Sequence, residues 1–430
     1  MSAHHEALAR TTLLLDQEWF SGQADKLKLA DALLGSTIRL VADAQTLSCR
    51  AGQTALVSAF MLTARMGLGI ELDVPNVAVI DLVAPLREPQ LRDALLELGD
   101  DLIPGGRVRT TTDEVQETFV FGTAASDHPD PVRVGASDFA ARLDRGGEGT
   151  PCGGHLPYGG FAAGAAVAAI ALQATLSRLE AATGRRARAP RPSPGPPVRI
   201  DLTQLFPGLR QGPAADVGDL DVISGGAITH ALIFCLLRIP KLRARLRVIE
   251  RQDAELSNVN RYSLLRASHD GTDKLQLLRE TATDRVQIEG VNTLFTRTTR
   301  AGLLPLAVRV LVGVDDIQAR WWAQEADPEW LAIGATGNHI AQLSTHVADT
   351  PCAACTHPVP LTTQTIPTIS FLSFWAGLLQ ACALLSRSPE PSNIFVYPFA
   401  LGGPTAIARF VPAWNPNCPL RCRGSRSAAA

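Results

Sequence analysis

The sequence predicts an α/β protein with two doubly wound lobes, and three observations support this fold class. Short apolar runs alternate with longer helical segments in both halves of the chain. A stretch rich in proline and arginine, residues 184–197, separates the halves. The chain has 430 residues, 46% hydrophobic and 19% charged, which is enough for two cores. We therefore expect one domain at residues 1–183, a linker at 184–197 and a second domain at 198–430.

The second half has the clearer pattern. "DLDVISGG" at residues 219–226 predicts a short buried strand that ends in glycines, and an apolar helix follows at 227–237. "RLRVIE" at 245–250 predicts the next strand. A strand, a helix and a second strand in this order begin a parallel sheet. Two more strands and one long helix are expected at 308–314, 329–336 and 368–385.

The first half repeats this plan less distinctly. It contains a strand-like run at 37–47, an amphipathic helix at 51–67, a second strand at 76–85 and an alanine-rich helix at 157–182. The last of these corresponds in order to the long helix of the second half. We interpret the two halves as degenerate copies of one fold.

Composition and charge limit the function. A net charge of −2 argues against nucleic acid or an anionic membrane as the main partner. The most apolar stretches, 161–176 and 371–385, are shorter than the roughly 18 residues needed to span a bilayer, so buried helices are expected. Eight cysteines and no export signal predict a cytoplasmic protein whose thiols bind metal or take part in catalysis.

The turn Ser224-Gly225-Gly226-Ala227 follows the first strand of the second half and precedes a helix. Backbone amides in such a turn favour a phosphate group, although an ordinary tight turn would have the same sequence. Glu250 ends the next strand, where an acidic side chain can accept hydrogen bonds from ribose hydroxyls. A capping carboxylate is the alternative interpretation.

The polar residues that follow suggest a site for a triphosphate. Asp253 leads into Ser257-Asn258-Val259-Asn260-Arg261-Tyr262, and Lys274 comes shortly afterwards. Arginine and lysine together can clamp phosphates. Asp315 and Asp316 follow a predicted strand, and a carboxylate at that edge suits Mg²⁺ bridging phosphates.

Three separated motifs, "ERQDAELSNVNRY", "HDGTDK" and "DDIQAR", resemble the ThiF-type adenylating family, which includes the ubiquitin-activating enzymes. The resemblance runs from about Asp219 to the C-terminus. It implies a Rossmann-like active lobe that binds ATP through the Gly225–Gly226 turn, Glu250 and Asp253. It further implies that Asn258 and Arg261 contact the phosphates, that Lys274 bridges the α-phosphate and an incoming carboxylate, and that Asp315 holds Mg²⁺.

The first half resembles the inactive adenylation lobe of ubiquitin-activating enzymes, through "AGQTALVSAFMLTARMG" and "PYGGFAAGAAVAAIA". It has neither the asparagine–arginine cluster nor the metal-type aspartate motif, so no ATP hydrolysis is expected there. In the family the inactive partner lends an arginine to the γ-phosphate. Arg10 is the only arginine early enough for that role, and a solvated helix face is the alternative.

The reaction implied by the resemblance is attack of a C-terminal carboxylate on the α-phosphorus of ATP. Positioning and charge neutralisation dominate such a step, since the carboxylate is already ionised. The implied partners are a ubiquitin-like protein and a conjugating enzyme, and a homodimer stays open. The two-lobed arrangement resembles components of bacterial conjugation operons, some of which are linked to antiviral defence.

Family members often transfer the acyl group to a cysteine, but the corresponding loop, near Thr363, has none. Cys152, in a glycine-rich segment near His155, is the best alternative thiol. Cys352 and Cys355 form CxxC, and Cys418 and Cys422 form CxxxC. In the family, two CxxC pairs in these places hold a structural zinc; the second pair here is one residue wider.

Three other functions compete with this interpretation. A sulfur-carrier adenylyltransferase of the thiamine or molybdopterin type is usually a single-lobed homodimer, which the apparent duplication argues against. A nicotinamide-dependent dehydrogenase would not explain Asn258, Arg261 and Lys274 together. A catalytically dead scaffold that binds a ubiquitin-like fold would turn over no ATP.

Overall fold

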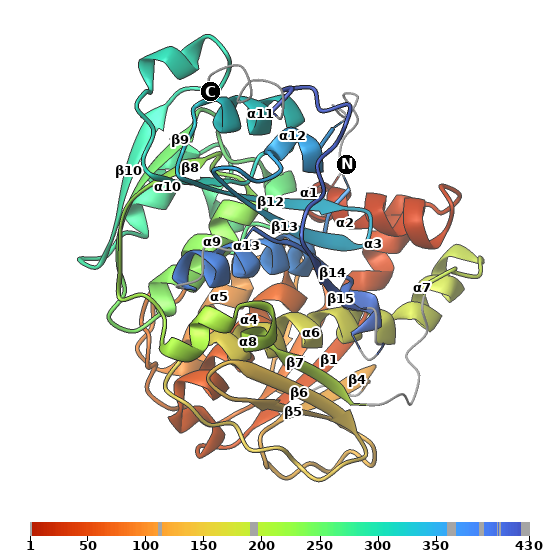
Figure 1. Ribbon diagram of the computed structural model, residues 1–430. Helices are drawn as coiled ribbons and strands as arrows, with labels where there is room; N and C mark the ends of the chain where they lie inside the picture. Colours follow the sequence, from red (N-terminus) through yellow and green to blue (C-terminus); the bar gives the residue numbers. More distant parts are fainter. Residues whose placement is uncertain are drawn as a thin grey trace.

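The computed structural model describes residues 2–110, 114–189, 197–358, 367–386, 391–401, 403 and 406–422. Its two sheets follow one plan (Figure 1). The strand order is β3-β2-β1-β4-β5-β6-β7 in the first sheet and β10-β9-β8-β11-β12-β13-β14-β15 in the second. In both, five parallel strands are followed by antiparallel ones. The structure thus confirms an α/β protein with two doubly wound lobes.

The first lobe surrounds the seven-stranded sheet. Its strands are β1 (Thr37–Ala42), β2 (Gly69–Asp73), β3 (Val108–Arg109), β4 (Glu117–Phe121), β5 (Val132–Ala136), β6 (Ala140–Arg145) and β7 (Val198–Asp201). Its helices are α1 (Ala3–Ala7), α2 (Ala9–Leu14), α3 (Lys26–Leu34), α4 (Arg50–Ala64), α5 (Leu91–Asp100), α6 (Tyr158–Ala174), α7 (Leu176–Thr183) and α8 (Leu202–Leu205).

The second lobe surrounds the eight-stranded sheet. Its strands are β8 (Asp216–Ile223), β9 (Arg243–Glu250), β10 (Val286–Asn292), β11 (Arg309–Val312), β12 (Trp330–Gly337), β13 (Ile340–Val347), β14 (Asn393–Val396) and β15 (Ile407–Phe410). Its helices are α9 (Ala227–Arg238), α10 (Lys274–Glu280), α11 (Ile317–Glu325), α12 (Ala353–Thr356) and α13 (Ser370–Leu385). All the strands and helices expected here have a counterpart.

One expected strand of the first lobe is absent from the described residues. Residues 76–85 form no strand, and Ala78 makes only an isolated bridge. The Gln53 side chain binds the carbonyl of Ala78 and the amide of Ile80, so this run is bonded as a loop. The strand that follows α4 is β2 instead.

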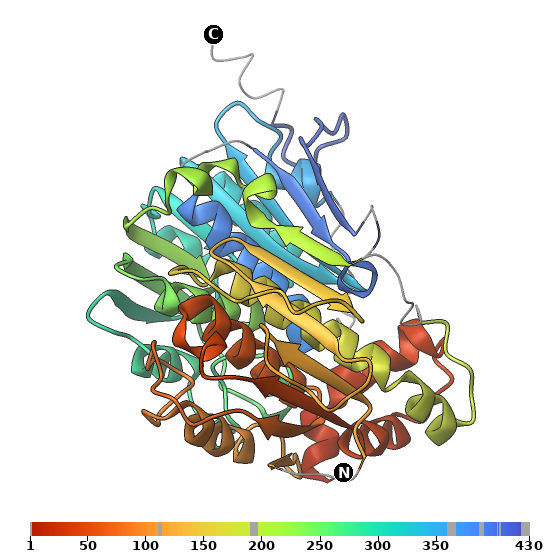
Figure 2. The ribbon, with the colours of Figure 1, turned by 90° about the horizontal axis from the view of Figure 1, so that it is seen from below.

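The boundary between the lobes also differs from the expected residue 198. Strand β7, which follows the predicted linker, pairs antiparallel with β6 of the first sheet (Figure 2). The second sheet begins only at Asp216. Residues 190–196 of the predicted linker lie outside the described residues.

Four helices join the lobes face to face: α4 and α6 from the first, α9 and α13 from the second (Figure 1). Phe161, Phe234 and Phe374 meet there, with ring centroids 5.6 to 6.1 Å apart. Within each lobe a glycine lets the two helices pack closely: a Cβ on Gly164 of α6 would lie 2.4 Å from Ser58 of α4, and one on Gly377 of α13 would lie 2.6 Å from Ala231 of α9. One hydrophobic core therefore runs through both lobes.

Helix α4 was expected to be amphipathic, but it is buried on all sides because it lies between a sheet and α6. The helical run Tyr158–Thr183 has 26 residues, as expected for the alanine-rich helix, and by length and composition could cross a membrane. However, 89% of its most apolar window is buried inside the structure, which fits the predicted core helix.

The first lobe also grips the segment that carries the polar motif. Arg65, at the end of α4, donates hydrogen bonds to the carbonyls of Val259, Ser263 and Leu265 at 2.6, 3.0 and 2.7 Å. Burial lowers the pKa of Arg65 to about 9, yet the guanidinium keeps its charge at neutral pH. Arg266 pairs with Glu97 at 2.7 Å. These contacts fix residues 259–266 against the first lobe.

Candidate active site

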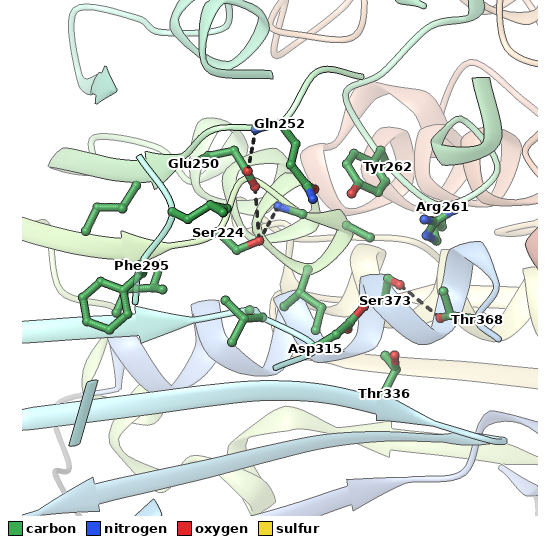
Figure 3. Close-up of a pocket in the computed structure, with 18 of the residues that line it drawn as sticks. Ser224, Glu250, Gln252, Arg261, Tyr262, Phe295, Asp315, Thr336, Thr368 and Ser373 are labelled. Carbon is green, nitrogen blue, oxygen red and sulfur yellow. Dashed lines mark hydrogen bonds between the residues drawn. The ribbon is translucent and has the colours of Figure 1, made fainter. Parts of the chain in front are cut away.

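A cavity of about 260 Å³ opens at the carboxyl edge of the second sheet, where β8, β9 and β11 end. This is the point at which the strand order reverses, the usual ligand position in a doubly wound sheet. In Figure 3, Glu250 and Gln252 lie on one side and Asp315 and Thr336 on the other. Arg261 and Tyr262 lie at one end, and Phe295 lies at the other.

The turn after β8 departs from the predicted phosphate cradle. Ser224 has a φ of 85°, a strained conformation for a residue with a side chain. The amide of Gly225 donates to Glu250 Oε2 at 2.9 Å, and the amide of Gly226 donates to Ser224 Oγ at 3.0 Å. Side chains thus already bind the two amides expected to receive phosphate. Gly226 lines the cavity and Gly225 lies behind it.

Glu250 is held at the cavity wall by further hydrogen bonds. Its Oε1 accepts from the amides of Arg251 at 2.7 Å and Gln252 at 2.9 Å, and its side chain is almost fully buried. The sequence allowed a ribose-binding or a capping carboxylate. Glu250 caps the turn and also lines the cavity.

The two asparagines have separate roles. Asn258 closes a short turn, with its Oδ1 accepting from the amide of Glu255 at 3.2 Å, and it does not line the cavity. Asn260 Oδ1 accepts from Arg261 Nη1 at 2.9 Å, and its Nδ2 donates to Thr11 at 2.8 Å. The second asparagine therefore orients the arginine and ties it to the first lobe. Our expectation that Asn258 contacts phosphate does not fit this geometry.

Arg261 and Lys274 form the basic side of the site. Burial lowers the pKa of both groups. Each cation lies near the ring of Tyr262, at 5.3 Å for Arg261 and 5.6 Å for Lys274. Arg261 lines the cavity, whereas Lys274 lies behind Gln252 and donates to its Oε1 at 3.1 Å. Lys274 is buried and does not line the cavity in this structure.

Asp315 and Asp316, which the sequence could not separate, have different surroundings. Asp315 lines the cavity at the end of β11. Asp316 is the N-cap of α11, with its side chain accepting from the amide of Gln318 at 2.8 Å. The predicted metal ligand thus faces the cavity, and its neighbour is used by the helix. Asp253 is exposed, and its backbone pairs with Asp273.

The N-terminal segment of the first lobe reaches this site. Thr11 in α2 binds Asn260, and Arg10 precedes it in the same helix. Burial is the main cause that lowers the pKa of Arg261, and the nearby Tyr262 raises it. The positive charge of Arg10 lowers the same pKa further. Arg10 therefore lies near Arg261 of the second lobe, and its role at a γ-phosphate stays a prediction.

Several lining residues had no expected role, among them Gln252, Tyr262, Thr336, Thr368 and Ser373. The hydroxyls of Thr368 and Ser373 lie 3.3 Å apart where α13 begins. Tyr262 and Gln252 were within the quoted motif and could have been chosen by their distance from Arg261 and Glu250. No local pattern distinguishes Thr336 or Thr368.

The four cysteines of the two pairs meet. Sγ–Sγ distances are 3.9 Å for Cys352–Cys355, 3.4 Å for Cys352–Cys418, 3.5 Å for Cys355–Cys422 and 3.6 Å for Cys418–Cys422. Zinc bound tetrahedrally at about 2.3 Å from each sulfur would separate them by roughly 3.8 Å. The wider CxxxC spacing therefore does not prevent a closed four-sulfur site.

Cys152, the thioester candidate, lies far from these features in the chain. Its thiol points at the carbonyl of Val134, 3.7 Å away. Burial raises the pKa of Cys152 to about 12, so little thiolate is present at neutral pH. This environment argues against Cys152 as the nucleophile. Thr363 lies outside the described residues.

Comparisons with known proteins give a partial match to one family. The model of the BilD N-terminal domain matches residues 37–189, which are most of the first lobe. The uncharacterized protein y4jF of Sinorhizobium fredii (strain NBRC 101917 / NGR234) is 27% identical over 345 residues. That alignment covers 75% of this chain and 61% of the relative, so the chain spans less than two thirds of that relative's length.

Among solved structures, E. coli MccB with ATP overlaps 47% of this chain and 65% of its own, with 14% identity and a TM-score of 0.38. The microcin C7 biosynthetic enzyme MccB in complex with N-formylated MccA overlaps 47% and 66%, with 13% identity and a TM-score of 0.39. At these scores the likeness is partial, and the fold is assigned from the strand order above.

Proposed function

We propose that this chain is an ATP-dependent adenylating enzyme that activates the C-terminal carboxylate of a ubiquitin-like protein. The observation that supports this most directly is the composition of one cavity. It combines an acidic side chain at the end of β9, a buried arginine and a carboxylate at the end of β11. A cavity with a cationic end and a facing carboxylate suits a Mg²⁺-bound triphosphate better than a hydride donor.

In this proposal Glu250 accepts a hydrogen bond from the ribose and Arg261 neutralises phosphate charge. Lys274 is the further cation. Its bond to Gln252 keeps it back, so we propose that the incoming carboxylate displaces Gln252 and lets Lys274 contact both reacting anions. Arg10 adds a charge from the first lobe. The carboxylate attacks the α-phosphorus, the bond to the β-phosphate oxygen breaks, and pyrophosphate leaves with its electron pair.

Two metals fit the residues present. A Mg²⁺ ion is usually bound by one or two carboxylates together with substrate phosphates, and Asp315 supplies such a carboxylate at the cavity. When bound, it would supply charge neutralisation on the phosphates. Cys352, Cys355, Cys418 and Cys422 would hold a structural Zn²⁺ that ties residues 418–422 to α12.

The partner assignments rest on the motif resemblance. We propose a conjugating enzyme as the acceptor of the activated protein, in a cytoplasmic bacterial conjugation pathway. Since Cys152 is disfavoured as a nucleophile, we propose direct transfer of the acyl group from the acyl-adenylate to the acceptor. The first lobe, which supplies Arg10 and Thr11, makes the site within a single chain, so activity would not require a homodimer.

The test is ATP–pyrophosphate exchange with a ubiquitin-like protein encoded beside this one. We expect exchange that requires the partner and falls about a hundredfold or more in Asp315→Asn, which removes the charge and keeps the shape. Asp316→Asn is the matched control, because asparagine caps a helix as well as aspartate does. No exchange with a partner that binds would exclude the enzyme and leave the scaffold.

A further inference from the structure

A buried hydrogen-bonded chain connects the cysteine cluster to the loop that carries Asp315. Arg320 Nη1 lies 3.2 Å from His357 Nδ1, and His357 Nε2 lies 3.2 Å from Ser344 Oγ. Ser344 Oγ lies 3.0 Å from His346 Nε2, and His346 Nδ1 lies 2.8 Å from the carbonyl of Pro351. Pro351 precedes Cys352 directly. All four side chains are buried.

The two ends determine the direction of every hydrogen bond. A guanidinium has only donors, so His357 Nδ1 accepts and its proton is on Nε2. A carbonyl only accepts, so His346 carries its proton on Nδ1. Ser344 then accepts from His357 and donates to His346. Each group in this series donates toward Pro351, and all four ring nitrogens of the two histidines have a partner.

Both imidazoles are neutral in this arrangement, and their surroundings agree with that. Burial lowers the pKa of His346 to about 4. Burial, together with the charge of Arg320, lowers the pKa of His357 well below its usual value. A neutral histidine keeps one donor and one acceptor, which is what the chain requires at both positions.

At the Arg320 end, the series of hydrogen bonds holds the backbone of Val314, which lies beside the cavity. Arg320 donates through Nε at 3.1 Å and Nη2 at 2.8 Å to the carbonyl of Val314, the residue before Asp315. Helix α11 has two further contacts with the cysteine segment. Gln324 Oε1 accepts from the amide of Ala353 at 3.0 Å, and Trp321 Nε1 donates to the carbonyl of His357 at 2.8 Å.

We infer that this series of hydrogen bonds positions Asp315. His357 and Ser344 are then positioning residues, and they couple a metal-bound cysteine cluster to the cavity. The inference deepens the proposed function and rests on it for its effect on Mg²⁺. A cluster closed around metal would hold Pro351 in place and, through the chain, the carbonyl of Val314. A loosened cluster would free that carbonyl and let Asp315 move.

The structural part is tested without any enzymatic activity. Long-range ¹H–¹⁵N spectra of protein labelled at histidine report the tautomer of each ring, with His346→Gln and His357→Gln used for assignment. We expect both rings neutral at neutral pH, with the proton of His357 on Nε2 and that of His346 on Nδ1. Removal of the metal with a chelator should shift both sets of signals. The opposite tautomer at either ring, or His357 signals unchanged by chelation, would overturn the inference.

The functional part uses Ser344→Ala, which breaks the chain in its middle and leaves Arg320 bonded to His357. The matched control is Ser36→Ala, which removes another buried hydroxyl whose hydrogen bond, to Ala32, lies in the first lobe. We expect the Mg²⁺ concentration for half-maximal exchange to rise about tenfold in Ser344→Ala only.

Equal Mg²⁺ dependence in the two variants would reduce Ser344 to a structural role and overturn the coupling. If the wild-type protein shows no exchange with a bound partner, the proposed adenylation fails. The tautomer and chelation spectra then decide alone whether the chain and its coupling to the cysteine cluster exist.

Discussion

His230 allows a quantitative test of the packing beneath the cavity. It lies in α9, is fully buried, and has no hydrogen-bond partner at either ring nitrogen within the part of the chain that the structure describes. Its ring centroid is 4.8 Å from that of Tyr262. Burial lowers the pKa of His230 well below its usual value, and the charges of Lys274, Arg65 and His269 lower it further.

The sign of the pH effect follows from these surroundings. Above a pH of about 6.5, the pKa of an unfolded histidine, both states are neutral and His230 adds no pH dependence. As the pH falls below that value, the unfolded chain binds a proton that the folded protein excludes, so stability is lost. At a pH of about 5.5 the loss from this one residue is RT ln(1 + 10), or about 1.4 kcal/mol.

The perturbation is His230→Leu, which removes the titration at similar volume and also removes two unpaired nitrogens. Urea unfolding would be followed by the fluorescence of the six tryptophans. Between pH values of about 7.5 and 5.5 the wild-type protein should lose about 1.4 kcal/mol more than the variant, since the other histidines are shared. Equal losses would show that His230 is solvated or paired when folded, and would refute the reasoning.

Two further predictions concern packing and metal. Gly377→Ala should lower the unfolding free energy by about 1–3 kcal/mol, despite the better helix propensity of alanine, because its Cβ would lie 2.6 Å from Ala231. Gly337→Ala, where no atom lies within 4 Å, should leave the thermal midpoint unchanged. Elemental analysis should find one zinc per chain, lost in Cys418→Ser and kept in Cys49→Ser. Zinc retained by Cys418→Ser would disprove the four-sulfur site.

The sequence predicted the fold well where periodicity and order carry the information. The βαβ start of the second lobe, its later strands and the duplication of the plan all appear in the structure. The failures have local causes. Residues 76–85 have the apolar content of a strand, but Gln53 binds their backbone instead. Strand β7 follows a linker-like stretch, so composition could not assign it to the first sheet.

The site was predicted less completely, because motif spacing indicates proximity but not orientation. Asp315, which follows a predicted strand, and Arg261, which lies in the first motif, both line the cavity as the sequence indicated. Asn258 is used by a turn, and Lys274 is held behind Gln252. Spacing alone could not say whether Asp315 or Asp316 faces the cavity. In the structure Asp316 caps α11 by accepting from the amide of Gln318, and Asp315 lines the cavity.

The first lobe helps to hold the cavity of the second lobe in shape. It has no counterpart of the asparagine–arginine cluster, yet its residues hold that cluster from two sides. Arg65 binds three carbonyls of the segment, and Thr11 binds Asn260, which in turn orients Arg261. If Arg65 lost one of these three carbonyl partners, its buried guanidinium would be poorly paired, and the folded state would be destabilised by a few kcal/mol. The geometry of the cation at the cavity therefore depends on the lobe that lacks the motif, and separation of the lobes would abolish the site even with every motif residue intact.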